Sequence, residues 1–197
     1  MRPRLALTVV LLLLLVAGTV AVLSAGGRPA PEDPVRASSA RPAGYEAAFR
    51  ALDLIKPSRQ KVADDFTLPT PDKATFRLSE QRGKIVMINF WATWCPPCLE
   101  EMPAMERLWR RHRDRGFVIV AISLDADPKV VPPFLAAHKF TFPVALDRRM
   151  EIAEKYGVRV LPSSIFVGKD GGLAAMALGP RAWDNQASHT LVDGLVR

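Results

Sequence analysis

The chain alternates between apolar runs of strand length and segments in which apolar residues recur every three or four positions. Continuous apolar runs at 84–91 (KIVMINFW) and 117–125 (FVIVAISLD) predict two central strands buried on both faces. Residues 142–147 predict a short strand, 163–178 a strand pair joined by an Asp-Gly turn, and 63–70 with 74–78 a hairpin. Helical patterns cover the cysteine stretch to about Arg115, 128–140, 151–158 and 186–196. Alternating β and α units with a terminal hairpin indicate an α/β domain with a mixed sheet.

A charge-free apolar stretch from Leu5 to Leu23 follows Arg2 and Arg4. A cleaved signal peptide has an apolar region of about 7 to 15 residues before an A-x-A-like site, whereas a spanning helix needs about 20. Leu23 would occupy a small-residue position of that site, so an uncleaved membrane anchor over 1–25 is favoured over a signal peptide. With the arginines on the cytoplasmic side, we expect single-pass attachment to the cytoplasmic membrane. Both interpretations place the folded part on the extracytoplasmic (periplasmic) side.

Residues 26–59 are rich in Pro, Ala, Gly and Arg and contain one short helical pattern, YEAAFRALDLI. This composition predicts a tether that holds the domain off the membrane, with the short helix packing on that domain. The 197 residues leave room for one ordinary domain, which we expect at 60–197.

The net charge of +7 divides into +4 for residues 1–59 and +3 for residues 60–197. The folded part is therefore only mildly basic. Its densest basic run, 110–115 (RRHRDR), falls where a helix is predicted to end, and cations at that end complement the helix dipole. No aromatic residues interleave with these charges, so no nucleic-acid partner is expected.

The only two cysteines, Cys95 and Cys98, lie in FWATWCPPCLEEMP, directly after a predicted central strand. A disulfide between them closes a loop too small to stabilise the fold much. A zinc site would need about four ligands, and the three histidines of the chain are scattered in the sequence. Haem attachment through CxxCH is excluded because Leu99 follows the second cysteine. A redox-active pair is favoured over a structural staple or a metal site.

The position of the pair predicts different roles for the two thiols. Pro96 or Pro97 fits the first turn of a helix, so Cys95 is expected at the helix amino terminus, where the dipole stabilises a thiolate. We expect Cys95 to attack and Cys98, one turn deeper, to resolve the mixed disulfide. The sequence has no flavin or nicotinamide motif, so we expect no cofactor and an electron supply from another protein.

These residues also carry a resemblance. FWATWCPPC is similar to the active-site strand and turn of thioredoxins, and YGVRVLPSSIFVGKDG resembles their second signature, which extends the match from about residue 63 to the end of the chain. With the anchor, the hairpin and an inserted αβ segment at 125–144, the chain most resembles the TlpA, ResA and DsbE (CcmG) group. The resemblance implies a thioredoxin-like fold, a cis Leu161–Pro162 bond facing the cysteines, and client binding by Trp94, Leu161 and Pro162.

The group consists of membrane-tethered thiol:disulfide oxidoreductases of cytochrome c biogenesis and related assembly pathways. The resemblance implies a membrane thiol transporter of the CcdA or DsbD kind as electron donor. It implies clients such as apocytochrome CxxCH motifs, or copper-delivery and cytochrome oxidase assembly proteins. The LPSS stretch lacks the acidic residue that many DsbE-type members carry after the proline, which weakens the cytochrome c assignment.

One acidic residue separates the group from ordinary thioredoxins, whose buried aspartate is replaced here by Asn89. On the active-site helix an apolar stripe includes one acid: Cys98, Glu101, Met102, Met105, Leu108 and Trp109. Resemblance to ResA-like proteins gives Glu101 the role of taking up protons for the cysteine pair. We expect it to be buried with a raised pKa, whereas Glu100 faces the polar side. Alternatively, Glu101 lies at the boundary of the apolar stripe and its carboxylate reaches solvent.

The expected function is therefore reduction of client disulfides outside the cytoplasm by a protein disulfide reductase. Two alternatives remain open. The first is a peroxiredoxin-like peroxidase, because peroxiredoxins share this fold. Peroxiredoxins need Thr or Ser three residues before the reactive cysteine, where this chain has Ala92. A non-enzymatic copper(I) carrier would use the same cysteine pair.

Overall fold

A five-stranded mixed sheet forms the centre of the computed structural model, which describes residues 44–57 and 61–197. The predicted anchor over 1–25 and two parts of the predicted tether, 26–43 and 58–59, lie outside the described residues. The elements are α3 (Tyr45–Ala51), β1 (Thr67–Pro69), β2 (Thr75–Arg77), η1 (Ser79–Gln81), β3 (Ile85–Trp91), α4 (Pro96–His112), η2 (Arg113–Arg115), β4 (Phe117–Ser123), η3 (Pro128–Val130), α5 (Val131–His138), β5 (Val144–Leu146), α6 (Glu151–Lys155), β6 (Ser163–Val167), β7 (Leu173–Leu178) and α7 (Gln186–Val196).

The strand order of the sheet is β5-β4-β3-β6-β7. β3, β4 and β5 are parallel, β6 is antiparallel to β3, and β7 is antiparallel to β6. The two long apolar runs form β3 and β4, and every residue of β3 is buried. The predicted turn joins β6 to β7 and contains Gly171 at φ +78°, a conformation that glycine adopts without steric cost. The predicted α/β fold with a mixed sheet is confirmed.

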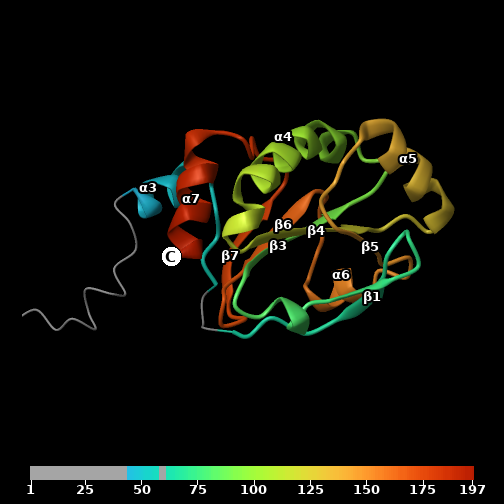
Figure 1. The fold of residues 1–197 in the computed structure, drawn as a ribbon, viewed down its shortest axis with the longest axis horizontal. Helices are drawn as coiled ribbons and strands as arrows, with labels where there is room; N and C mark the ends of the chain where they lie inside the picture. Colours follow the sequence, from blue (N-terminus) through green and yellow to red (C-terminus); the bar gives the residue numbers. More distant parts are fainter. Residues whose placement is uncertain (1–43, 58–60) are drawn as a thin grey trace, which may run out of the picture. The chain divides into compact units, whose positions relative to one another are not determined.

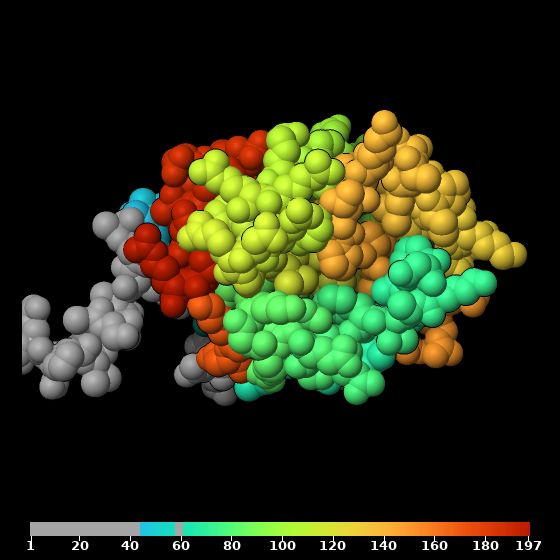
Figure 2. Space-filling model, viewed as in Figure 1, coloured from blue at the N-terminus to red at the C-terminus, as the bar shows by residue number. Residues whose placement is uncertain are grey.

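Helices and the β1–β2 hairpin cover the two faces of the sheet (Figure 1). Successive side chains of a strand point to opposite faces. One face carries α4 and α7, which lie side by side in Figure 2, and the other carries the hairpin and α6. β3 supplies alternate residues to both cores: Ile85, Met87 and Trp91 to the first, and Val86, Ile88 and Phe90 to the second.

The short helix predicted within the tether is α3, and it packs against α7. Tyr45, Ala48 and Phe49 of α3 are buried in the same core as the α4 face of the sheet. The Tyr45 ring approaches Gly194 of α7 so closely that a Cβ atom at Gly194 would lie 2.5 Å from it. Glycine at this position therefore permits the close contact between the two helices.

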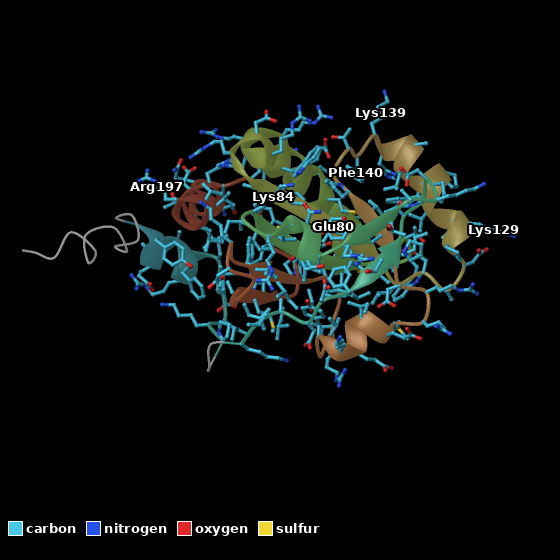
Figure 3. The ribbon with its side chains drawn as sticks, turned by 60° about the horizontal axis from the view of Figure 1, so that its bottom comes forward. Glu80, Lys84, Lys129, Lys139, Phe140 and Arg197 are labelled. Carbon is cyan, nitrogen blue, oxygen red and sulfur yellow. A yellow bond between two sulfur atoms is a disulfide. The ribbon has the colours of Figure 1, made fainter. Side chains whose placement is uncertain are left out.

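The inserted segment at 125–144 contains η3 and α5. Lys129 and Lys139, near the two ends of this segment, point away from the protein (Figure 3).

Within residues 44–57 and 61–197, no helix has the length and apolar character needed to cross a membrane.

Candidate active site

The chain turns from β3 into α4 through residues 92–95, and Cys95 caps the helix. The Cys95 carbonyl oxygen accepts hydrogen bonds from the backbone N–H of Cys98 (3.1 Å) and Leu99 (3.2 Å). Pro96 and Pro97 occupy the first turn, where an N–H group has no helical partner. The predicted location of Cys95 at the helix amino terminus is confirmed.

Cys95 and Cys98 form a disulfide with a Cα–Cα distance of 5.4 Å, so the structure shows the oxidised protein. Cys95 is 4% exposed and Cys98 is completely buried. A partner that approaches from solvent therefore reaches the Cys95 sulfur first. After reduction, the amino terminus of α4 would stabilise a Cys95 thiolate by its dipole and its unpaired N–H groups, an effect that fades within one turn.

The Leu161–Pro162 peptide bond is cis, as the resemblance predicted. β6 begins at the next residue, Ser163, which pairs with Phe90 near the end of β3. The cis bond therefore lies at the edge of the sheet from which the cysteine turn projects. Within the described ranges, no hydrogen bond involves the backbone of Leu161.

A groove of about 600 Å³ runs from the cysteine turn to α6 and the loop before the cis bond. Cys95 and Pro96 form part of its wall, while Glu154 and Arg159 are its charged residues. The remaining wall is largely apolar: Trp94, Leu124, Met150, Ala153, Val158, Val160 and Leu161. Trp94 is 68% exposed, so a large aromatic side chain meets solvent at the rim of this largely apolar groove.

Glu101 lies inside the protein on the face of α4 that contacts the sheet and is 4% exposed. Its Oε1 atom accepts a hydrogen bond from Asn89 Nδ2 (2.8 Å). Its Oε2 atom accepts bonds from the Arg181 backbone N–H (2.9 Å) and the Trp183 indole Nε1 (3.0 Å). Glu100, the adjacent acid, is exposed. The predicted burial of Glu101 is confirmed.

Burial raises the pKa of Glu101 from 4.5 to about 7, because a carboxylate loses its hydration there. The hydrogen bonds from Arg181, Asn89 and Trp183 and the charge of Arg181 favour the carboxylate and limit the rise. Glu101 therefore changes its protonation state near neutral pH, in the range where a group can both accept and donate a proton.

Asp125 is a site residue that the sequence did not predict. It follows β4 and is buried, and its carboxylate accepts hydrogen bonds from Thr93 N (3.1 Å), Thr93 Oγ1 (2.6 Å) and Ser123 Oγ (2.8 Å). The carboxyl ends of the parallel strands β3 and β4 meet at one edge, and Asp125 holds the cysteine turn there. The acid that ends the second apolar run was the available signal.

Two histidines that look scattered in the sequence come together between α4 and α7. His112 Nε2 lies 3.0 Å from His189 Nδ1, and both rings are buried. In the part of the chain that the structure describes, no group of three or more His, Cys, Asp or Glu residues is arranged to hold a metal ion.

The structure thus gathers the predicted site residues in two layers. Trp94, Cys95 and Leu161 line the groove and Pro162 does not, while Cys98 and Glu101 are buried on the inner face of α4. Asn89 was predicted only as a substituted aspartate, and Trp183 and Arg181 were not predicted. The catalytic and client-binding roles of these residues stay predictions.

Comparisons with known proteins agree on one class. The AhpC/TSA family model matches residues 60–176. Thiol-disulfide oxidoreductase ResA of Oceanobacillus iheyensis is 39% identical over 113 residues, which are 57% of this chain and 59% of that ResA. ResA of Bacillus anthracis is 35% identical over 135 residues, which are 68% of this chain and 77% of that ResA.

Solved structures give the same picture. StoA from Bacillus subtilis has a TM-score of 0.54 and 27% identity, and the match covers 61% of this chain and 92% of StoA. A thiol:disulfide interchange protein of the thioredoxin family from Chlorobium tepidum has a TM-score of 0.63 and 25% identity over 72% of this chain and 99% of its own. The chain, with its disulfide-forming CxxC pair, therefore belongs to the AhpC/TSA family and, within it, to the TlpA/ResA/DsbE group of thiol:disulfide oxidoreductases.

Proposed function

We propose that this oxidoreductase reduces the disulfides of client proteins outside the cytoplasm, in the assembly of cytochrome c or cytochrome oxidase. The observation that supports a protein client is the apolar groove, which exposes Trp94 beside the reactive end of the disulfide. A groove of about 600 Å³ accommodates a short peptide segment. The Leu161 backbone, which has no hydrogen-bond partner within the described residues, supports pairing with an extended client strand there.

In the proposed reaction the Cys95 thiolate attacks one sulfur of the client disulfide. A Cys95–client mixed disulfide forms, the client S–S bond breaks, and the other client sulfur leaves as a thiolate. The Cys98 thiolate then attacks the Cys95 sulfur, and the second client thiolate leaves. Two electrons pass to the client, and this protein is left with the Cys95–Cys98 disulfide seen in the structure.

Glu101 is proposed to take the proton that Cys98 must lose before this second attack. Cys98 and Glu101 are three residues apart on α4, so they share one face of the helix. A carboxyl group with a pKa of about 7 is partly ionised at neutral pH and can accept that proton without solvent. Because acid and thiol interact, their titrations should belong to the pair.

The donor and the clients are inferred from the family. Regeneration of the dithiol needs two electrons, for which we propose a membrane thiol transporter of the CcdA or DsbD kind. Clients are proposed to be apocytochrome CxxCH motifs or the cysteines of copper-delivery and oxidase assembly proteins. The absence of an acidic residue after Pro162 favours the second group.

Trapping with cysteine variants tests this function. The Cys98→Ser variant should accumulate a mixed disulfide with a disulfide-bearing CxxCH peptide or copper-chaperone domain, and the captured mass identifies the client. The matched Cys95→Ser variant should capture none, because Cys98 is buried. Faster capture by Cys95→Ser than by Cys98→Ser would reverse the two roles, and capture at an equal rate would remove the distinction between them. If the reduced wild type passed no electrons to these disulfides but consumed hydrogen peroxide, or only bound copper(I), the peroxidase or carrier alternative would replace the reductase.

A further inference from the structure

Arg181 lies in the loop between β7 and α7 and is the most heavily bonded side chain near the active site. Its side chain is only 16% exposed. The guanidinium group donates to backbone oxygens of two separate segments and to one carboxylate: Leu52 O (2.6 Å), Asp53 O (3.0 Å), Leu178 O (3.1 Å), Gly179 O (3.3 Å), Pro180 O (2.9 Å) and Asp53 Oδ2 (3.2 Å). It therefore ties its own loop to the carboxyl end of α3.

The same loop supplies both N–H donors of Glu101 Oε2. One is the backbone amide of Arg181 itself, at 2.9 Å, and the other is the indole of Trp183, at 3.0 Å. The loop also reaches the cis proline, because Gly179 N donates to Pro162 O (2.9 Å). A shift of this loop would move the donors of the buried carboxylate and the support of the client-binding loop together.

The loop has little regular structure to hold it in place. Gly179 has φ +81° and Pro180 has no N–H group, so neither can extend β7. The carbonyl oxygens of Leu178, Gly179 and Pro180 all lie around one guanidinium nitrogen, Nη1, while Nε and Nη2 donate to the end of α3, so the planar group joins the two segments. Lysine, whose ammonium group is a single point, lacks this fork geometry.

We propose that Arg181 is the positioning residue of the active-site acid: by fastening the 179–183 loop to the end of α3, its guanidinium group holds the two N–H donors on Glu101 and links α3 to the redox centre. The proposal rests on the proposed role of Glu101. It extends that role from one carboxyl group to the loop and helix that hold it.

The charge of Arg181 and its positioning of the loop must be tested separately, because the Arg181 cation also acts directly on Glu101. The groups that contact Glu101 from β3 and from the loop are Asn89, Trp183 and Arg181, and only Arg181 is charged. Arg181→Lys keeps the charge and loses the fork, whereas Arg181→Met loses both. A positioning role predicts that both variants change Glu101, while a purely electrostatic role predicts that only Arg181→Met does.

The test is a direct titration of Glu101 in the oxidised full-length protein. Carboxyl-¹³C glutamate labelling gives a signal for each acid, and Glu101→Gln assigns the one of interest. We expect the wild-type signal to titrate near pH 7. In Arg181→Lys and Arg181→Met it should titrate about one pH unit higher, a roughly tenfold change in proton affinity, because the carboxylate loses donors.

Asp53→Asn is the matched control. The Asp53 side chain is 96% exposed and its residue has φ +48°, which asparagine tolerates, so this variant removes only an exposed ion pair. Its Glu101 titration should equal that of the wild type. A wild-type titration in Arg181→Lys would overturn the proposal in favour of charge alone. A downward shift would also overturn it, since the loop would then only shield the carboxyl group from water.

Urea unfolding of the same variants distinguishes positioning of Glu101 from a purely structural role. A purely structural role would lower the unfolding midpoint without changing the Glu101 titration. If Arg181→Met does not fold, Arg181→Lys alone decides the question. The titration needs neither client nor electron donor. It therefore stands even if Glu101→Gln leaves thiol exchange unchanged, a result that would remove the proposed function of Glu101 but not the positioning by Arg181.

Discussion

Glu101 is a carboxyl group placed where its charge is costly and only partly compensated. Three N–H donors point at its two oxygens, yet burial still raises its pKa to about 7. A fold that needed only a polar contact at this position could use a neutral amide at lower cost. The cost of this burial supports the proposed role of Glu101 in proton transfer.

Replacement of Glu101 by Gln should make stability less dependent on pH. Between pH 4.5 and about 7 the folded protein binds the Glu101 proton more tightly than the unfolded chain does, so the free energy of unfolding falls as the pH rises. Above pH 7 the loss reaches its full value, about 3 kcal/mol at 1.36 kcal/mol per pKa unit. Glu101→Gln should remove this loss and be the more stable protein at pH 8, with little difference at pH 4.5.

Urea unfolding of the oxidised proteins at pH 4.5 and pH 8 measures this effect without interference from thiol titration. The amide introduced by Glu101→Gln can be accommodated by a flip of the Asn89 side chain. Asn89 Oδ1, which is buried without a hydrogen-bond partner in the described part of the chain, would then face the new N–H donor. Glu100→Gln, on the exposed side of α4, is the control and should match the wild type. The same pH slope in Glu101→Gln and wild type would show that Glu101 has an ordinary pKa.

At the residue scale the sequence predicted which side chain is buried but not what holds it. The helical spacing of Cys98, Glu101 and Met105 places Glu101 on the inner face of α4 whatever the rest of the chain does. Its donors Arg181 and Trp183 are 80 and 82 residues away in the sequence. They come from an irregular loop that has no periodic pattern, so only the fold brings them to the acid.

At the element scale the active site depends on where strands end and helices begin. The apolar runs at β3 and β4 and the two prolines before Cys98 were sufficient to predict the cysteine turn. The strand order was not predictable in the same way, because the hydrogen-bonded neighbours β3 and β6 are separated in the chain by two strands, three α-helices and two 3₁₀ helices. That pairing brings Leu161, at the cis bond, to the wall of the groove that Cys95 also lines.

A charge in the groove should weaken client binding without disturbing the thiols. Val160 is 47% exposed on the groove wall, and Val160→Asp would place a carboxylate against a buried client surface. We expect reduction of a disulfide-bearing peptide at low concentration to slow about tenfold, which corresponds to about 1.4 kcal/mol of binding free energy. Reduction of a small disulfide such as oxidised glutathione should be unchanged, because it needs only the Cys95 sulfur.

Val130→Asp is the comparison variant for this experiment. Val130 is 40% exposed on η3 and does not line the groove, so the same change in charge and size is made on another surface. Stopped-flow measurement of thiol oxidation follows both substrates. Equal slowing of the peptide and the small disulfide, or equal effects of the two valine variants, would contradict a client-binding role for this wall.

At the scale of the whole molecule, the chain divides into a unit at 1–40 and a folded unit at 41–197. The folded unit contains every element of the redox site, and α3 begins it by packing on α7. The proposed positioning by Arg181 would make α3 more than the end of a tether, since this helix then fastens the loop that holds Glu101.

Membrane attachment through residues 5–23 is the corresponding prediction for the first unit. Nineteen residues of α-helix at 1.5 Å per residue span about 28 Å, close to the roughly 30 Å of a bilayer core. We expect the full-length protein in the membrane fraction of expressing bacteria, resistant to alkaline carbonate. Leu13→Arg with Leu14→Arg, at about 3 kcal/mol per central arginine, should prevent stable insertion.

Labelling of the cysteines in intact cells measures the orientation of the folded unit. After mild reduction, a membrane-impermeant thiol reagent should modify Cys95 in spheroplasts, because we expect Arg2 and Arg4 to keep the amino terminus in the cytoplasm and the domain outside. The gel mobility of the labelled chain distinguishes an uncleaved anchor from a cleaved signal peptide. Labelling that occurs only after lysis would place the site in the cytoplasm, where reduced thioredoxins are already abundant, and a separate reductase supplied with electrons through the membrane would have no purpose there.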